Sequence, residues 1–181
     1  VLQELITQIK EAQARPDVQA LTVPQPAAQQ LLALPVWING SYMVREFGRH
    51  LSGLQARQGS RPVPLRQIDK TSWQADCSGR AALVITYRVY AFDTSVRAAF
   101  LDSRRGFFNN TSLCLRVVGH EAAVHRLELA RLPRGWEVAT AMPALRGVRT
   151  EDPIALAGIA RTAIRIRATG QLSGVIDDFN G

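Results

Sequence analysis

The sequence is poor in the residues that mark several large classes of protein. It has two cysteines, Cys77 and Cys114, and only three histidines in 181 residues. Two cysteines do not make the disulfide framework of a small secreted domain, and neither has a cysteine or histidine nearby at metal-binding spacing. We interpret both as small buried or half-buried thiols, with Cys114 on a strand.

Long hydrophobic runs are missing as well. No apolar stretch approaches the ~20 residues that a helix needs to span a bilayer. The first sixteen residues contain Glu4 and Glu11 and lack the basic-then-apolar order of a secretory signal. We therefore expect no membrane partner and a cytoplasmic location.

Lysine is almost absent, because only Lys10 and Lys70 occur and the other basic residues are arginine. The net charge is +7, and residues 80–149 hold eleven arginines against five acids. A basic middle region can attract nucleic acid. These arginines are scattered rather than clustered, which favours a solvated strand face, so we expect no nucleic-acid partner.

What the chain does contain is a core and a strand pattern. Hydrophobic residues make up 46% of it, enough for one domain. In residues 83–92 large side chains alternate on both faces, which predicts a central strand covered on each side. Short extended segments joined by Gly/Pro turns predict a mostly β fold, an antiparallel β-sandwich or a saddle-shaped sheet. Further strands are predicted at 18–23, 34–38, 53–57, 71–75, 112–118, 124–132, 136–141 and 162–168, with 29–34 as a bridge.

Helices are predicted only near the two ends. Apolar residues at helical spacing predict a helix over residues 1–15 that stops before Pro16. A second short helix is predicted over residues 154–160. We divide the chain into an extension, a β-rich domain and a C-terminal segment of undefined fold. These parts comprise residues 1–17, 18–143 and 144–181.

The densest polar segment is residues 34–51, LPVWINGSYMVREFGRHL, which turns at Asn39-Gly40. An acid suits the ammonium of a peptide end, and arginine suits a carboxylate or a carbonyl. Alternatively, the aromatic residues belong to the core and the charges to the surface, and the sequence leaves both readings open. The candidate binding residues here are Ser41, Tyr42, Arg45 and Glu46.

A second polar segment, residues 93–112, lies between two predicted strands, where binding loops often occur. Gly106, Phe107 and Phe108 followed by two asparagines predict a tight turn with exposed aromatics, because asparagine tolerates positive φ. The alternative is a hairpin with packed phenylalanines, and the sequence does not decide between them. The candidates here are Arg105, Asn109 and Asn110.

Two catalytic motifs are absent. His120 and His125 are five residues apart, whereas the zinc motif H-E-x-x-H has four, and five residues of helix turn the side chains about 140° apart. Ser41 lacks the G-x-S-x-G elbow, and no residue orients His50 as a base. We therefore expect neither a catalytic residue nor a metal site in this chain.

Three segments in order resemble the N-terminal β domain of the glycyl aminopeptidase family. They are residues 34–51, 87–113 (YRVYAFDTSVRAAFLDSRRGFFNNTSL) and 133–143 (PRGWEVATAMP). Within them, the family's G-S-Y-[ML]-[VI]-R-E-F segment matches residues 40–47, and its R-G-F-F-N-G-T-S segment matches residues 105–112. Asn39 replaces a usual proline, and Asn110 replaces a usual glycine.

The resemblance implies a modular zinc metallopeptidase of the thermolysin-like type, in which a catalytic domain with H-E-x-x-H and a PDZ domain follow the β domain. It implies that this chain is an isolated or truncated N-terminal domain without a cofactor, inactive alone, with zinc in the catalytic domain. Its partners would be that catalytic domain and, in the full enzyme, a peptide substrate. An exposed docking face also favours self-association. The alternative is a stand-alone β-sandwich that binds a peptide or protein through residues 93–112.

Overall fold

The computed structural model describes residues 18–38, 42–95, 97–102, 104–121, 123, 125–129, 136–139, 154–158 and 163–168. This part of the chain is mostly β, and every strand pair in it is antiparallel. None of its helices is long and apolar enough to cross a membrane. The predicted helix over residues 1–15 lies outside the described residues.

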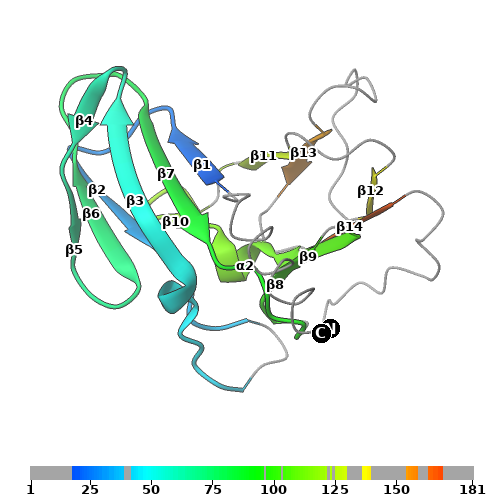
Figure 1. The fold of residues 1–181 in the computed structure, drawn as a ribbon. Coiled ribbons are helices and arrows are strands. Elements are labelled where there is room, and N and C mark those ends of the chain that lie inside the picture. Colours follow the sequence, from blue (N-terminus) through cyan, green and yellow to red (C-terminus); the bar gives the residue numbers. More distant parts are fainter. Residues whose placement is uncertain are drawn as a thin grey trace.

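Two four-stranded sheets form a β-sandwich (Figure 1). In the first, the central strand β7 lies between β1 and β3, and β4 forms the edge; in the second, β2 and β6 are central. The first sheet comprises β1 (Val18–Val23), β7 (Leu83–Val89), β3 (Leu51–Gln58) and β4 (Arg61–Val63). The second comprises β10 (Arg116–Val117), β2 (Gln29–Ala33), β6 (Ser72–Asp76) and β5 (Leu65–Gln67).

A third sheet and a strand pair lie beside the sandwich (Figure 1). The third sheet has the order β12 (Trp136–Ala139), β14 (Ala163–Ala168), β9 (Arg105–Asn109) and β8 (Ala99–Leu101). The pair is β11 (His125–Leu129) with β13 (Ile154–Gly158). Two short helical turns complete the described elements: η1 (Phe47–His50) and α2 (Asn110–Leu113).

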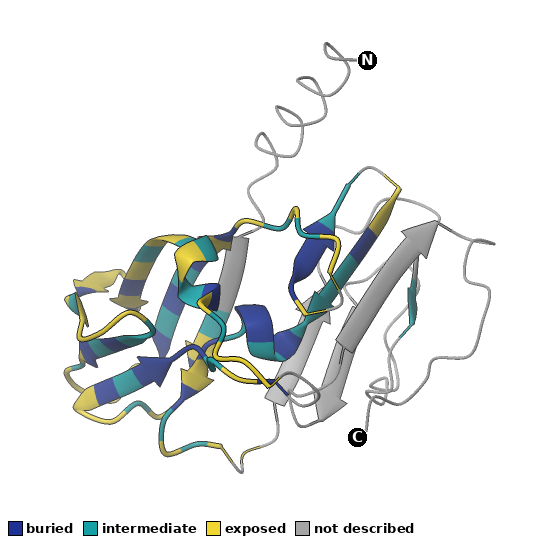
Figure 2. Cartoon of the chain, turned by 90° about the horizontal axis from the view of Figure 1, so that it is seen from below, coloured by how far each residue is buried: buried dark blue, intermediate teal, exposed yellow. Residues whose placement is uncertain are grey.

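The core lies between the sheets of the sandwich. Alternate residues of β7 are buried, and they pack with buried residues of β2, β6 and the segment around α2. Figure 2 shows the resulting alternation of buried and exposed residues along the strands. Complete burial of a leucine or isoleucine contributes roughly 1.5–3 kcal/mol. The largest apolar side chains that are almost fully buried are Leu32, Leu34, Leu83 and Ile85.

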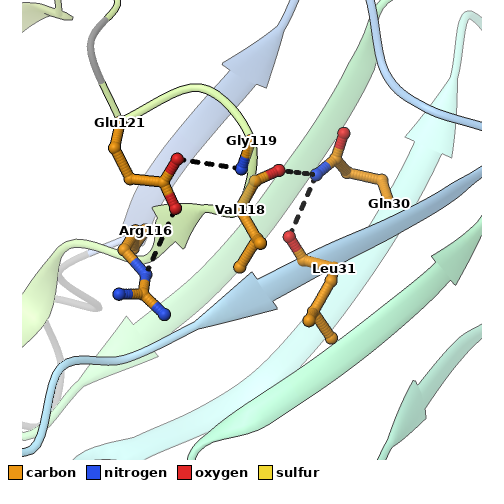
Figure 3. A network of polar contacts seen from close by, with 6 residues as sticks. All are labelled: Gln30, Leu31, Arg116, Val118, Gly119 and Glu121. Carbon is orange, nitrogen blue, oxygen red and sulfur yellow. Dashed lines mark hydrogen bonds and ion pairs between the residues drawn. The ribbon is translucent and has the colours of Figure 1, made fainter.

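A buried glutamine holds β2 against the chain after β10 (Figure 3). Gln30 is 1% exposed, and its Nε2 donates to the carbonyl oxygens of Leu31 at 3.0 Å and Val118 at 3.1 Å. Its Oε1 accepts a hydrogen bond from the backbone of Ala27 at 3.1 Å. Three bonds satisfy this amide, which a buried polar group requires. They reinforce a ladder of only two residue pairs between β2 and β10.

The chain leaves β7 by crossing from the sandwich to the third sheet. Phe92 forms a bridge with Phe100 of β8, and the amide of Asp93 donates to Ala99 at 3.0 Å. At the same point the amide of Tyr90 donates to the carbonyl of His50 at 2.8 Å. This crossing places η1 and the loop after β7 next to each other.

Several predicted elements are corrected by the structure. The strand predicted at 34–38 is wrong: the strand is β2, in the segment taken as a bridge, and it ends before Pro35, which has no N–H for a ladder. The helix predicted at 154–160 is wrong, because this apolar segment pairs with β11 as β13. A short apolar run is compatible with a helix or a strand, and here its pairing with β11 makes it a strand.

The region 106–118 also differs from expectation. Gly106 to Phe108 belong to β9, and the turn precedes them, where Asp102 Oδ1 accepts from the amides of Arg104 and Arg105 at 2.8 and 2.7 Å. The hairpin alternative is therefore correct. The strand predicted at 112–118 begins only at Arg116, because α2 precedes it.

The central position of β7 is confirmed, but its two faces are covered unequally: Val84 and Thr86 on the second face are only half-buried. Leu83, Ile85, Tyr87 and Val89 are buried on one face, whereas Arg88 on the other face is exposed. Tyr90, beyond the end of the strand, is 59% exposed. Large side chains on both faces of a strand therefore did not mean burial on both.

Candidate functional site

A pocket of about 340 Å³ lies where η1 meets the loop after β7. The backbone bond between Tyr90 and His50 joins the two segments, and the rings of the same residues stack with centroids 6.0 Å apart. The buried side chains of Phe47 and Ala98 give the pocket an apolar part. The pocket is lined by Val44, Arg45, Glu46, Phe47, Arg49, His50, Asp93, Ser95, Arg97 and Ala98.

Three arginines line this pocket, Arg45, Arg49 and Arg97, and we call it the arginine pocket. It also contains two carboxylates, of Glu46 and Asp93, both already engaged. Among the described residues, Arg49 and Arg97 have no carboxylate within ion-pair distance, and an arginine side chain ends in a rigid planar donor suited to an oxyanion. The arrangement is therefore suited to binding an anion.

Glu46 is paired with a lysine from the turn before β6. Lys70 Nζ lies 3.0 Å from Glu46 Oε1, and this hydrogen bond, together with the charge of Lys70, lowers the pKa of Glu46 below its ordinary value of 4.5. Both side chains are exposed, so water screens the pair and its contribution to stability is small. In the pocket, the ammonium of Lys70 compensates the charge of Glu46, which stays ionised.

Asp93 is engaged by its own loop. Its Oδ1 accepts a hydrogen bond from the amide of Ser95 at 2.8 Å, and this backbone bond is the main reason that the pKa of Asp93 is lowered. The bond is a local side-chain-to-backbone turn typical of aspartate. It fixes the loop that carries Arg97 into the pocket.

His50 is a neutral member of the pocket at pH 7. Burial lowers its pKa from the ordinary 6.5, the charge of Arg49 lowers it further, and Asp93 opposes both. Arg49 Nε donates to His50 Nε2 at 3.2 Å, so that nitrogen acts as an acceptor. His50 therefore orients Arg49 and adds no charge.

The predicted binding residues fall into two separate groups. Arg45 and Glu46 line the arginine pocket, and Tyr42 lies just outside its lining with 97% of its surface exposed. Ser41 lies outside the described residues. The structure thus brings part of the first polar segment to the pocket.

The other group is engaged in local structure. The guanidinium of Arg105 lies over the ring of Phe100 at 4.9 Å. Asn109 caps α2 by accepting from the amide of Thr111 at 2.9 Å. Asn110 is 1% exposed and begins α2 in a right-handed helical position, so it needs no glycine there. None of these three lines the arginine pocket.

The sequence reasoning missed Arg49, Asp93 and Ser95 as site residues. Arg97 was not among the predicted site residues either, and His50 was considered only as a possible base. The sequence did contain a hint, because Arg49 and His50 end the first polar segment and Asp93 and Ser95 begin the second. The sequence does not show that these two ends meet, because their contact depends on the strand crossing after β7.

An exposed apolar surface adjoins the pocket. Tyr42, Met43 and Val44, which we call the apolar tip, are 97%, 62% and 73% exposed. Trp37 is 51% exposed on the other arm of the same loop, which the bond from the amide of Arg45 to the carbonyl of Val36 holds at 2.7 Å. Neighbouring exposed apolar residues of this size mark interaction surfaces.

The described residues do not provide a metal centre. They contain no group of three or more His, Cys, Asp or Glu side chains close enough to hold an ion. His120 follows β10 in a turn and His125 begins β11, so the two do not share a helix. The zinc of a metallopeptidase therefore has no fitting ligand set in this part of the chain.

Comparisons with known proteins give two findings. The family described as Peptidase M61 N-terminal domain matches residues 8–152. A crystal structure of an aminopeptidase N family protein from Idiomarina loihiensis is similar, with 38% sequence identity and a TM-score of 0.76. The match covers 83% of this chain and 26% of that one, so the chain spans about a quarter of the solved relative. No curated protein matches significantly.

Proposed function

This chain belongs to the Peptidase M61 N-terminal domain family, and from that premise we propose that it is the non-catalytic β domain of a glycyl-aminopeptidase-like zinc metallopeptidase. In this role it docks on the catalytic domain and forms one wall of the peptide-binding cleft. The zinc and the catalytic residues belong to the catalytic domain. The cytoplasmic location expected from the sequence stays a prediction.

The exposure of the apolar tip is the observation that carries this proposal. Three consecutive apolar or aromatic residues in water are unfavourable unless a partner covers them. The solved relative is about four times as long as the matched segment, so its remaining chain offers such a partner. Because Val44 belongs to both the tip and the arginine pocket, a domain on the tip would border the pocket.

The gene itself provides the first test. The proposal expects the reading frame downstream of this chain to encode H-E-x-x-H, since the thermolysin-like domain follows the β domain. A downstream region without this motif would contradict the proposal. The purified chain should neither bind stoichiometric zinc nor hydrolyse glycyl or alanyl anilides, and chelator-sensitive turnover would also contradict it.

The second test measures docking. The chain and the domain that carries H-E-x-x-H are produced separately, and their affinity is measured by calorimetry. Replacing Tyr42 and Met43 together by serine should weaken binding at least tenfold, roughly 1.4 kcal/mol, because aromatic anchors carry much of an interface's energy. The control is Gln55→Ser on the exposed face of β3, which should leave the affinity unchanged.

A stand-alone binding module is the second candidate function, and the arginine pocket favours it because the pocket is formed within this chain. Such a module would bind its peptide or protein partner with no catalytic domain present. It predicts that the serine variant of the apolar tip behaves like the parent chain in all binding assays. The docking measurement therefore separates the two functions.

A further inference from the structure

The arginine pocket has three features of a binding site for one kind of chemical group. Its charge is set by arginines, part of its wall is apolar, and both of its carboxylates are engaged by other groups. Each of these features restricts the chemical class of ligand that the pocket can bind.

The charges in the pocket favour an anionic over a cationic ligand. Glu46 is paired with Lys70 at 3.0 Å, and Asp93 is bonded to the amide of Ser95 at 2.8 Å. In the described part of the chain, no carboxylate lies within ion-pair distance of Arg49 or Arg97. These guanidinium groups can therefore accept an external oxyanion without first breaking an ion pair.

The identity of the basic residues indicates which kind of anion the pocket binds. Arginine presents a rigid fork of N–H groups that matches the two oxygens of a carboxylate, whereas lysine presents a single charged point. The hydrogen bond from Nε of Arg49 to His50 holds one of these forks in place. A second fork, that of Arg97, comes from the loop fixed by Asp93.

The apolar part of the wall indicates that the carboxylate is attached to an apolar or peptide body. Val44 lines the pocket and is 73% exposed, beside the buried Phe47 and Ala98. A small inorganic anion would leave the side chain of Val44 in water. A volume of about 340 Å³ accommodates a terminal residue of a peptide, near the lower bound of small-molecule sites.

We infer that the arginine pocket binds a peptide carboxylate through Arg49 and Arg97. Two sources share this chemistry: the C-terminal carboxylate of a short peptide and the side chain of an acidic residue. The inference deepens the proposed function, on which its biological meaning rests. A carboxylate pocket on the cleft wall would make the enzyme prefer short or acidic peptides.

The test measures binding of four small peptides to the 181-residue chain. Binding is monitored by chemical-shift changes in two-dimensional NMR spectra of the chain. The probes are acetyl-Phe-Ala with a free carboxylate, acetyl-Phe-Ala-amide, acetyl-Phe-Glu-amide and acetyl-Phe-Gln-amide. The expected affinity of the carboxylate probe is on the order of 1 mM, as for a few solvent-exposed contacts. Binding of the first probe alone indicates a C-terminal carboxylate, and binding of the third indicates an acidic side chain. Equal binding of acid and amide, or no binding, would overturn the inference.

Variants identify the groups responsible. Arg97→Gln and Arg49→Gln should each weaken the affinity for the carboxylate probe by about tenfold. The affinity of Arg97→Lys should lie between those of the parent chain and Arg97→Gln, because lysine keeps the charge but loses the forked donor. The matched control is Arg80→Gln, an exposed arginine before the opposite end of β7, which should not change the affinity. Unchanged binding in both Arg49→Gln and Arg97→Gln would overturn the inference.

A measurement on the parent chain tests the inference even if the variants fail to fold. Affinity should fall when the salt concentration rises from about 20 mM to about 300 mM, because salt screens exposed charges. Salt-independent binding would count against an arginine–carboxylate contact. The peptide assay needs no catalytic domain, so its failure leaves the docking result standing, and failed docking leaves the peptide result standing.

Discussion

The hydroxyl group of Tyr87 donates a hydrogen bond to the carbonyl oxygen of Leu113 at 2.8 Å. The hydroxyl oxygen of Tyr87 in turn accepts a longer hydrogen bond from the amide of Leu115 at 3.4 Å. Tyr87 is 3% exposed in the middle of the first sheet, and the two backbone groups follow α2. One side chain therefore ties the central strand to the segment that leads into β10.

Removing this hydroxyl should destabilise the fold. Tyr87→Phe leaves a buried carbonyl and a buried amide without their partner, which costs about 1–3 kcal/mol. Urea unfolding followed by far-UV circular dichroism would measure the change in the free energy of unfolding. Tyr90→Phe, at a residue that is 59% exposed, is the control and should change it by less than about 0.5 kcal/mol. Equal stability of the two variants would contradict the role of the bond.

Replacing Gln30 by leucine tests the amide network of Figure 3. The amide of Ala27 and the carbonyl oxygen of Val118 lose the bond that Gln30 supplies, whereas the carbonyl oxygen of Leu31 keeps its bond from the amide of Val118 at 3.0 Å. The expected loss of stability is about 3 kcal/mol. The same replacement at Gln29, the exposed neighbour on β2, should be close to neutral. Thermal unfolding of both variants distinguishes them, and similar midpoints would mean that the buried amide contributes little.

Gly48 is required for a steric reason. A Cβ atom built on it would lie 2.6 Å from the carbonyl oxygen of Lys70, a backbone atom that cannot move aside freely. Gly48→Ala should therefore cost about 1–3 kcal/mol, as overpacking does.

Gly53 provides the contrast for that test. Its φ is +62° at a bulge in β3, and a Cβ atom there would meet no neighbour within 4 Å. Asparagine tolerates this conformation, so Gly53→Asn should be milder than Gly48→Asn. Urea midpoints of the two asparagine variants give the comparison, and the reverse order would refute the steric explanation.

Alkaline pH should weaken the fold through the buried Tyr87 and the half-buried Cys114. Burial raises the pKa of Tyr87 above its ordinary 10.0 and that of Cys114 from 9.0 to about 12. In the unfolded chain these groups lose their protons first, so the native state binds more protons and stability falls as pH rises. The contribution is complete below pH 9 and declines from there upward.

Urea midpoints at pH 8, 9, 10 and 11 would show this decline. The double variant Tyr87→Phe, Cys114→Ala removes both titrating groups, and its midpoint should fall less between pH 9 and pH 11 than that of the parent chain. Parallel curves for the two proteins would show that other groups cause the alkaline loss.

The fold was predictable from the sequence wherever one periodicity dominated. Alternation in residues 83–92 identified β7 and its central position, and the segments at 18–23 and 162–168 became β1 and β14. The predictions failed at short apolar runs such as residues 154–158, where local pattern suits a helix or a strand equally. They also failed at 106–113, where Asn109 caps a helical turn that strand periodicity does not reveal.

The sequence by itself determined the mostly β class, the family resemblance and the two polar segments. Only the tertiary structure decided which ends of those segments meet. His50 and Asp93 are far apart in sequence, and they lie in one pocket because the chain after β7 bonds to η1 and then joins β8. Residue types and spacing determine local structure, whereas contact between distant segments depends on strand pairing across the whole sheet.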